Sequence, residues 1–246
     1  MTSPVRAGAI LLDIEGTTTP IAFVTEVLFP YARAHVREHL EHRASRPAYA
    51  EIITALRAEH RLEQQSADPP PAWDDAAGSW LDATVRYVEW LMDRDRKSTP
   101  LKSLQGRIWE DGYHRGEIIG EVFEDVPRAL AAWQRQGVPV SIFSSGSVLA
   151  QQLLFRHSSS GDLSGFIRGH FDTTVGPKVA ADSYRRIAAA VGTPPESILF
   201  VSDVTRELDA ARAAGLQACL AVRPGNSPPP PGHGYRESRS FDDLIQ

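Results

Sequence analysis

Four groups of polar residues follow short apolar runs in this sequence, and together they could transfer a phosphoryl group. In chain order these groups are Asp13 with Glu15, Ser144 with Ser145, Lys178, and Asp203. A carboxylate can attack phosphorus, further carboxylates can hold a hard cation, and hydroxyl, amide and ammonium groups can bind phosphoryl oxygens. The complete set therefore favours a phosphohydrolase over a binding module without catalysis.

The first group contains the candidate nucleophile. Asp13 is the first carboxylate after the apolar run 9–12, and it would form an aspartyl-phosphate that water then cleaves. Glu15, next to Gly16, could bind a cation through its backbone carbonyl or act as a general acid and base. Acidic residues after strands are also common as turn caps, so this pair alone leaves both interpretations open.

The other candidates each have a plainer alternative. Ser144 and Ser145 stand between a predicted strand and a predicted helix, where their hydroxyls could bind phosphate or cap the helix. Lys178 could place a positive charge on the phosphate and the nucleophile, or could be a solvated lysine. Asp203 could supply an oxygen to Mg²⁺. Glu207, one helical turn later, could support the metal but is explained more simply as an exposed helix residue. The order of all the groups together favours catalysis.

The elements that must position these residues alternate along the chain. Short apolar runs predict strands at residues 9–12, 138–143, 198–201 and 218–222. Helical patterns separate several of them, as at 126–136 and 180–191. This alternation indicates an α/β fold with a doubly wound parallel sheet, in which ligands bind beyond the carboxyl ends of the strands. The polar groups stand at such ends.

A long helical segment interrupts this pattern after the first strand. Residues 23–117 show helical periodicity and no strand pattern, so we predict an all-helical cap domain inserted into a core made of residues 1–22 and 118–246. A core with one insertion suits a chain of 246 residues. We expect Phe23, Trp80 and Trp109 to be mostly buried, although one or two of them could contact a substrate.

Composition limits the partners of the protein. With 26 basic and 31 acidic residues the formal net charge is -5, so a nucleic-acid partner is not expected. The single cysteine, Cys219, lies in an apolar run and is expected to be buried in a strand. No segment approaches the ~20 apolar residues of a membrane span. We therefore expect a cytoplasmic protein without a membrane partner, and a monomer because no exposed apolar helix stripe stands out.

The motifs resemble those of a known class, the haloacid dehalogenase-like hydrolases. Members of this class share an aspartate-led strand end, a serine or threonine, a lysine and a terminal acidic pair, in that order. Their first motif usually has aspartate at its third position, where this chain has Glu15. With this difference, the segments 13–21, 144–148, 176–178 and 202–207 resemble the enolase-phosphatases of methionine salvage, also called acireductone synthases. The resemblance extends from about residue 10 to residue 225.

The resemblance implies a ligand set and a reaction. It implies Mg²⁺ at Asp13, Glu15 and Asp203, and substrate contacts at Ser144, Ser145 and Lys178. It also implies the small phosphate ester 2,3-diketo-5-methylthiopentyl 1-phosphate as substrate, which would be enolised and then dephosphorylated to the acireductone. The base for enolisation stays open: Glu15 is a candidate, and Glu110 and His114 are weaker ones, since His114 is explained more simply as a surface residue.

Two alternatives remain open at this stage. The same fold and nucleophile could act on another small phosphate ester, because cap residues select substrates and a fold does not determine function. A signalling phosphoacceptor domain also combines acidic residues, a hydroxyl residue and a lysine on a doubly wound sheet. The large helical insertion, and an acidic strand end that follows Lys178, disfavour this second alternative.

Overall fold

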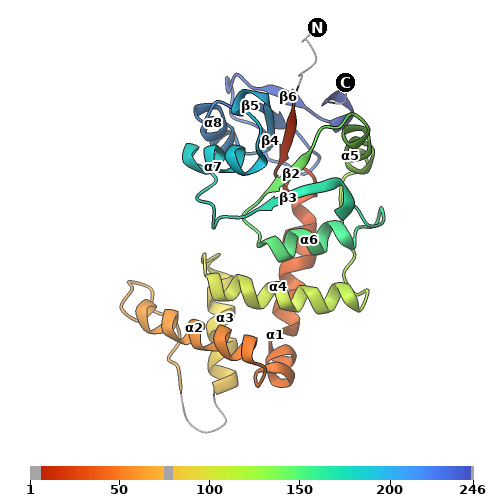
Figure 1. Ribbon diagram of the computed structural model, residues 1–246. Coiled ribbons are helices and arrows are strands. Elements are labelled where there is room, and N and C mark those ends of the chain that lie inside the picture. Colours follow the sequence, from red (N-terminus) through yellow and green to blue (C-terminus); the bar gives the residue numbers. More distant parts are fainter. Residues whose placement is uncertain (1–6, 75–79, 245–246) are drawn as a thin grey trace. The chain divides into compact units, whose positions relative to one another are not determined.

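The computed structural model describes residues 7–74 and 80–244 and divides the chain into two compact units. The described residues of Met1–Glu26 and Ile119–Gln246 form one unit, the α/β unit, and those of Val27–Ile118 form the other, the helical unit (Figure 1). Within each unit the elements follow from the sequence patterns, with a few differences.

The α/β unit contains one six-stranded parallel sheet. Its strands are β1 (Ala9–Leu12), β2 (Val140–Phe143), β3 (Ile167–Phe171), β4 (Ile198–Ser202), β5 (Gln217–Ala221) and β6 (Arg236–Ser238). The strand order is β3-β2-β1-β4-β5-β6, so β1 lies between β2 and β4. The chain therefore reverses its direction of travel across the sheet at β1, which creates the kind of switch point where α/β proteins bind ligands.

This sheet confirms the predicted fold class, with local differences. The strand β3 was not among the predicted strands, although it pairs with β2. The second strand begins at Val140 rather than at residue 138, because Pro139 has no N–H to donate and contributes only its carbonyl, which accepts from Ile10 N at 2.9 Å. The strand β6 has no apolar pattern: it is three residues long, and it pairs with β5 through its backbone. Cys219 is buried in β5, as predicted.

Helices cover both faces of the sheet. These are α5 (Asp125–Arg135), α6 (Val148–Arg156), α7 (Ala181–Val191) and α8 (Thr205–Ala213), with short 3-10 helices at Ser164–Phe166, Pro195–Ser197 and Phe241–Leu244. Figure 1 shows α7 and α8 together on one side of the sheet and α5 on the other. Tyr184 of α7 is buried with its ring 5.4 Å from the ring of Phe143 and 5.1 Å from that of Phe200, measured between centroids. This packing holds α7 against β2 and β4.

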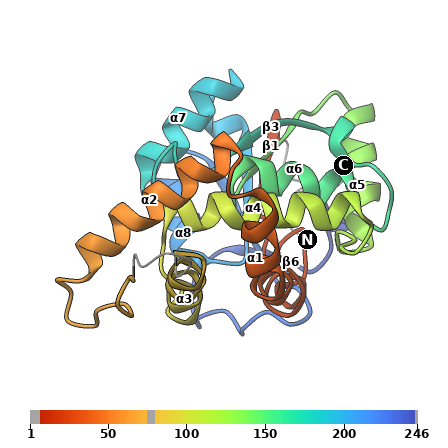
Figure 2. The same cartoon turned by 90° about the horizontal axis from the view of Figure 1, so that it is seen from below.

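The helical unit is built from four helices that share one apolar core. After the π-helix Phe23–Leu28 come α1 (Phe29–Arg43), α2 (Pro47–Glu63), α3 (Trp80–Asp93) and α4 (Thr99–His114). Figure 2 views α3 nearly along its axis while α4 runs across the view. Each helix buries a leucine completely at this core, namely Leu40, Leu56, Leu91 and Leu104. No strand occurs among residues 27–74 and 80–118.

Two of the three expected aromatic core residues are buried. Phe23 and Trp109 are shielded from solvent, and the Trp109 indole N–H donates to Leu28 O at 2.7 Å. The expectation is wrong for Trp80, the first residue of α3, which is 38% exposed. None of the helices in residues 7–74 and 80–244 is long and apolar enough to cross a membrane.

Candidate active site

The candidate site lies where β1 and β4 end side by side. Leu12 of β1 is the register partner of Val201 of β4, so the next residues, Asp13 and Ser202, are neighbours at the carboxyl edge of the sheet. Asp13 N donates to Val201 O at 3.0 Å, which continues the strand pairing by one more bond. The backbone therefore determines where the candidate nucleophile sits.

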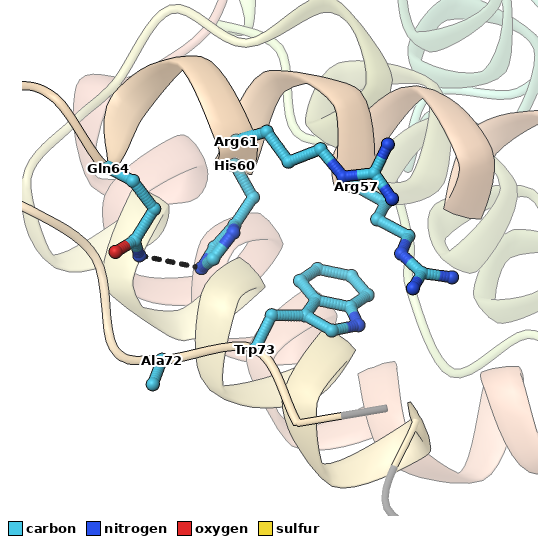
Figure 3. Close-up of a pocket in the computed structure, with 6 residues that line it drawn as sticks. All are labelled: Arg57, His60, Arg61, Gln64, Ala72 and Trp73. Carbon is cyan, nitrogen blue, oxygen red and sulfur yellow. Dashed lines mark hydrogen bonds between the residues drawn. The ribbon is translucent and has the colours of Figure 1, made fainter. Parts of the chain in front are cut away.

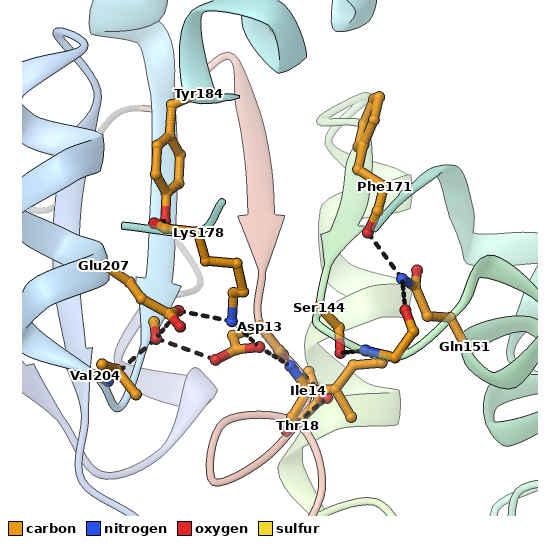
Figure 4. Close-up of polar contacts among 12 residues, drawn as sticks. Asp13, Ile14, Thr18, Ser144, Gln151, Phe171, Lys178, Tyr184, Val204 and Glu207 are labelled. Carbon is orange, nitrogen blue, oxygen red and sulfur yellow. Dashed lines mark hydrogen bonds and ion pairs between the residues drawn. The ribbon is translucent and has the colours of Figure 1, made fainter. Parts of the chain in front are cut away.

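A buried network surrounds Asp13. Lys178 Nζ lies 2.7 Å from Asp13 Oδ1 and 2.6 Å from Glu207 Oε2, as Figure 4 shows. Ser202 Oγ lies 3.1 Å from Asp13 Oδ2 and 3.0 Å from Glu207 Oε2. Ile14 N adds a bond of 2.7 Å to Asp13 Oδ1. The lysine and the serine thus bridge the same two carboxylates and close a ring of four side chains.

This network corrects one expectation and adds one residue. The simpler interpretation of Glu207 as an exposed helix residue is wrong, because its side chain is buried in the first turn of α8 and is paired with Lys178. Ser202 was not among the predicted residues, although it is completely buried and contacts Asp13. A hydroxyl residue at a strand end, directly before a candidate metal ligand, was the available signal for Ser202.

The charges in this site are not balanced. Burial alone would lower the pKa of Lys178, but Asp13 and Glu207 outweigh that effect and raise it, so the lysine stays protonated. The pKa of Asp203 is raised to about 7, first by burial and then by the negative charge of Asp13. The same two causes, in the same order, raise the pKa of Glu207 to about 7. Three carboxyl groups share one ammonium group, and further positive charge would stabilise them.

Asp203 approaches the turn that follows Asp13. Gly16 adopts a left-handed conformation with φ of 64°, and its N–H donates to Thr19 O at 2.8 Å. A Cβ on Gly16 would lie 2.8 Å from Asp203 Cγ and closer still to Asp203 Oδ2. Glycine at this position therefore allows the Asp203 carboxylate to lie against the turn that carries Glu15.

The two predicted serines and Glu15 differ in their exposure to solvent. Ser144 is buried after β2 and accepts a hydrogen bond from Gly146 N at 3.1 Å, while Ser145 is exposed at the start of the same loop. The buried amide of Gln151 donates to Gly146 O at 3.0 Å and to Phe171 O at 2.8 Å, which ties this loop to the end of β3 (Figure 4). The side chain of Glu15 is exposed.

The weaker candidates for the enolisation base belong to the helical unit. Glu110 and His114 lie on α4, where Glu110 is half-buried and His114 is exposed. The helical unit also has a surface pocket of about 310 Å³, shown in Figure 3 and lined by Arg57, His60, Arg61, Gln64, Ala72 and Trp73. This lining contains none of the predicted site residues.

The residues around Asp13 fit a magnesium ion. Residues 7–74 and 80–244 contain no group of three or more His, Cys, Asp or Glu side chains placed to hold a metal. Mg²⁺ does not need one, because it commonly keeps several waters and binds one or two carboxylates together with substrate phosphate. Asp13 and Asp203 offer two such carboxylates beside an unbalanced negative charge.

Comparison with known proteins agrees with the fold. The family model for haloacid dehalogenase-like hydrolase matches residues 7–215. A crystal structure of the UTR4 protein from Saccharomyces cerevisiae aligns with a TM-score of 0.78 and 32% identity, covering 96% of this chain and 99% of that one. The fold and the site thus define a hydrolase of the haloacid dehalogenase-like class.

Sequence relatives narrow the assignment within this class. Enolase-phosphatase E1 of Synechococcus elongatus is 50% identical over 244 residues, which are 99% of this chain and 100% of that protein. A probable bifunctional methylthioribulose-1-phosphate dehydratase/enolase-phosphatase E1 of Vitis vinifera is 47% identical over 248 residues, 99% of this chain and 48% of the plant protein. The chain is an enzyme that belongs to the enolase-phosphatase E1 family of haloacid dehalogenase-like hydrolases.

Proposed function

We propose that this enzyme converts 2,3-diketo-5-methylthiopentyl 1-phosphate to the acireductone and inorganic phosphate, a step of methionine salvage. The observation that carries this proposal is the buried Asp13–Lys178 pair at the switch point of the sheet. The chain that contains this pair is 50% identical to an enolase-phosphatase over 99% of its length. We also propose that the enzyme is cytoplasmic and acts as a monomer.

In the phosphatase step, a carboxylate oxygen of Asp13 attacks phosphorus. The bond between phosphorus and the enediol oxygen breaks, that oxygen takes up a proton, and an aspartyl-phosphate remains on Asp13. Water then attacks the phosphorus, which releases inorganic phosphate and restores the carboxylate. Lys178 and the Ser144 loop, with its serine hydroxyls and backbone amides, bind the phosphoryl oxygens and offset the negative charge on them.

Mg²⁺ would be held by the carboxylates of Asp13 and Asp203 and by the backbone carbonyl of Glu15. When bound, it would supply positive charge to the phosphoryl oxygens and to the carbonyl oxygen that becomes an enolate. Burial gives such a charge a large effect here, since few waters screen it. Lys178 contacts Asp13 directly and is itself paired with Glu207.

In the enolase step, a base removes a proton from the carbon next to the substrate carbonyl. Glu15 is the candidate base that the α/β unit offers, because its carboxylate is exposed two residues after Asp13. The backbone carbonyl of Glu15 would then bind the cation, and its side-chain carboxylate would remove the proton.

A continuous assay of both half-reactions tests the proposed function. The purified protein is given the diketone phosphate with Mg²⁺, and enediol absorbance and released phosphate are followed together. We expect both signals, and we expect much slower phosphate release from a panel of sugar phosphates. Phosphate release from many sugar phosphates without turnover of the diketone phosphate would instead assign the enzyme to another small ester.

A further inference from the structure

The loop that follows β5 contacts the turn after Asp13 at two successive carbonyl groups. Asn226 Nδ2 donates to Gly16 O at 2.9 Å, and Arg223 Nε donates to Thr17 O at 3.0 Å. Both donors come from a part of the chain more than two hundred residues away from the turn that they hold. They contact the segment immediately after Glu15, the proposed carbonyl ligand of the cation.

Arg223 is itself firmly held. It is buried, its Nη1 lies 2.7 Å from Asp125 Oδ2, and its guanidinium carbon lies 4.7 Å and 4.4 Å from the ring centroids of Phe123 and Phe241. A guanidinium stacked between two rings and paired with a buried carboxylate has little freedom to move. The bond to Thr17 O is therefore a fixed point for the turn.

The side-chain oxygen of Asn226 lies near Asp203 and is an unsatisfied hydrogen-bond acceptor among the described residues. Asn226 Nδ2 faces two carbonyl groups, Gly16 O and, at 3.4 Å, Ala221 O, so the orientation of the amide is determined by its acceptors. Its Oδ1 is buried and has no hydrogen-bond partner within the described part of the chain. A Cβ on Gly16 would lie 2.8 Å from this oxygen and also within contact of the Asp203 carboxylate.

Asn226 Oδ1 and the Asp203 carboxylate are both hydrogen-bond acceptors, and they repel each other when no donor lies between them. A buried acceptor without a partner also costs free energy. A hydrated cation would remove both penalties, because its bound water can donate to one oxygen while the ion attracts the other. The unsatisfied Asn226 oxygen thus points to a ligand at the place where Asp203 meets the turn.

We propose that Arg223 and Asn226 are positioning residues that set the geometry of the magnesium site. Together they fix the Gly16–Thr17 backbone so that the Glu15 carbonyl faces the cation, and Asn226 Oδ1 accepts a hydrogen bond from water on that cation. This inference rests on the proposed function for the identity of the ion, and it assigns a task to a loop that contains none of the motif residues.

Magnesium binding by the substrate-free protein tests the inference. Isothermal titration calorimetry with MgCl₂ is performed on the wild type, on Asn226→Ala and on the control Ser227→Ala, whose exposed side chain is next in the loop. We expect Asn226→Ala to weaken the Kd for Mg²⁺ about tenfold, with an unfolding temperature close to that of the wild type, because it removes an outer-shell partner. Ser227→Ala should bind as the wild type does.

Arg223→Lys is the second variant, because it keeps the charge facing Asp125 but cannot reproduce the fixed bond to Thr17 O. We expect Arg223→Lys to weaken Mg²⁺ binding as well. This second variant tests the inference independently if Asn226→Ala folds poorly. Unchanged Mg²⁺ affinity in both folded variants would overturn the inference while leaving the proposed function intact. A wild type that binds no Mg²⁺ would overturn the metal assignment, and with it the inference.

Discussion

Among the described residues, Lys178 is the only cationic side chain in direct contact with Asp13, the proposed nucleophile, and it also contacts Glu207. It bridges Asp13 and Glu207, while burial and the charge of Asp13 hold the pKa of Asp203 at about 7. Crowding three carboxyl groups around one lysine destabilises the folded protein, so the arrangement is better explained by ligand binding than by stability. Single substitutions in this cluster should therefore change catalysis more than folding.

Glu207→Gln tests whether the position of Lys178 depends on its ion pair with Glu207. The substitution keeps the volume of the side chain but removes the charge that holds Lys178 Nζ at 2.6 Å. We expect kcat to fall about ten- to a hundredfold, as for other supporting contacts around a site, with an unchanged circular dichroism spectrum. Steady-state kinetics on the diketone phosphate measures this, and wild-type kcat would show that Glu207 has no such role.

Gly16→Ala tests the close approach of Asp203 to the turn. The new Cβ would overlap the Asp203 carboxylate, so one of the two must move and Mg²⁺ binding should be lost. Gly137→Ala is a matched control, because its φ of 72° is similar and nothing lies within 4 Å of its added Cβ. Both variants carry the strain of a left-handed alanine, about 1 kcal/mol. Equal Mg²⁺ affinity in the two would contradict the steric account.

The sequence predicted the residues that carry the chemistry better than those that support them. Asp13 and Lys178 were predicted from their places at strand and helix ends, and the structure brings them into contact. Glu207 was interpreted as a surface residue and Asn226 was not singled out, because the contacts of both are with residues far away in the sequence or on other elements. Asn226 contacts a carbonyl 210 positions away, and no local pattern encodes such a contact.

At the scale of elements, the adjacency of β1 and β4 creates the site. Apolar runs predicted both strands, and the alternation of strands and helices predicted that they are parallel, but their order in the sheet is a property of the whole fold. The short strand β6 was not predictable, since its three polar residues pair through backbone bonds alone. Patterns of side chains thus predict elements better than they predict neighbours.

A buried histidine in the helical unit makes this unit sensitive to acid. His39 of α1 lies 2.6 Å from Tyr49 Oη, with Arg43 and Asp111 also beside it. Burial, with help from the positive charge of Arg43, lowers the pKa of His39 to about 4. The unfolded chain, in which the pKa of His39 is about 6.5, therefore binds a proton more readily than the folded protein does. The contribution of neutral His39 to folding stability is complete above pH 6.5 and is lost as the pH falls toward 4.

His39→Gln should reduce this sensitivity. In the wild type the free energy of unfolding should fall by up to about 3 kcal/mol between pH 7 and pH 4 through this residue. The variant lacks the titrating group, so its loss over the same interval should be smaller by a similar amount. Urea denaturation followed by helical circular dichroism at both pH values measures the difference, and the same loss in both proteins would exclude His39 as the cause.

At the scale of the whole molecule, one chain supplies an α/β unit with the proposed nucleophile and a helical unit inserted after β1. The cyanobacterial relative matches over its full length, whereas the plant relative is about twice as long and its name includes a dehydratase. This chain therefore covers about half of the plant protein.

The most direct test of this account is to trap the phosphorylated enzyme. The wild type and Asp13→Asn are mixed with the diketone phosphate and Mg²⁺, quenched in acid during turnover, and digested for mass spectrometry. We predict a phosphate group on Asp13 in the wild type, and none in Asp13→Asn, which should also release no phosphate while remaining folded. Phosphate on another residue, or continued turnover by Asp13→Asn, would contradict the central claim that Asp13 is the nucleophile.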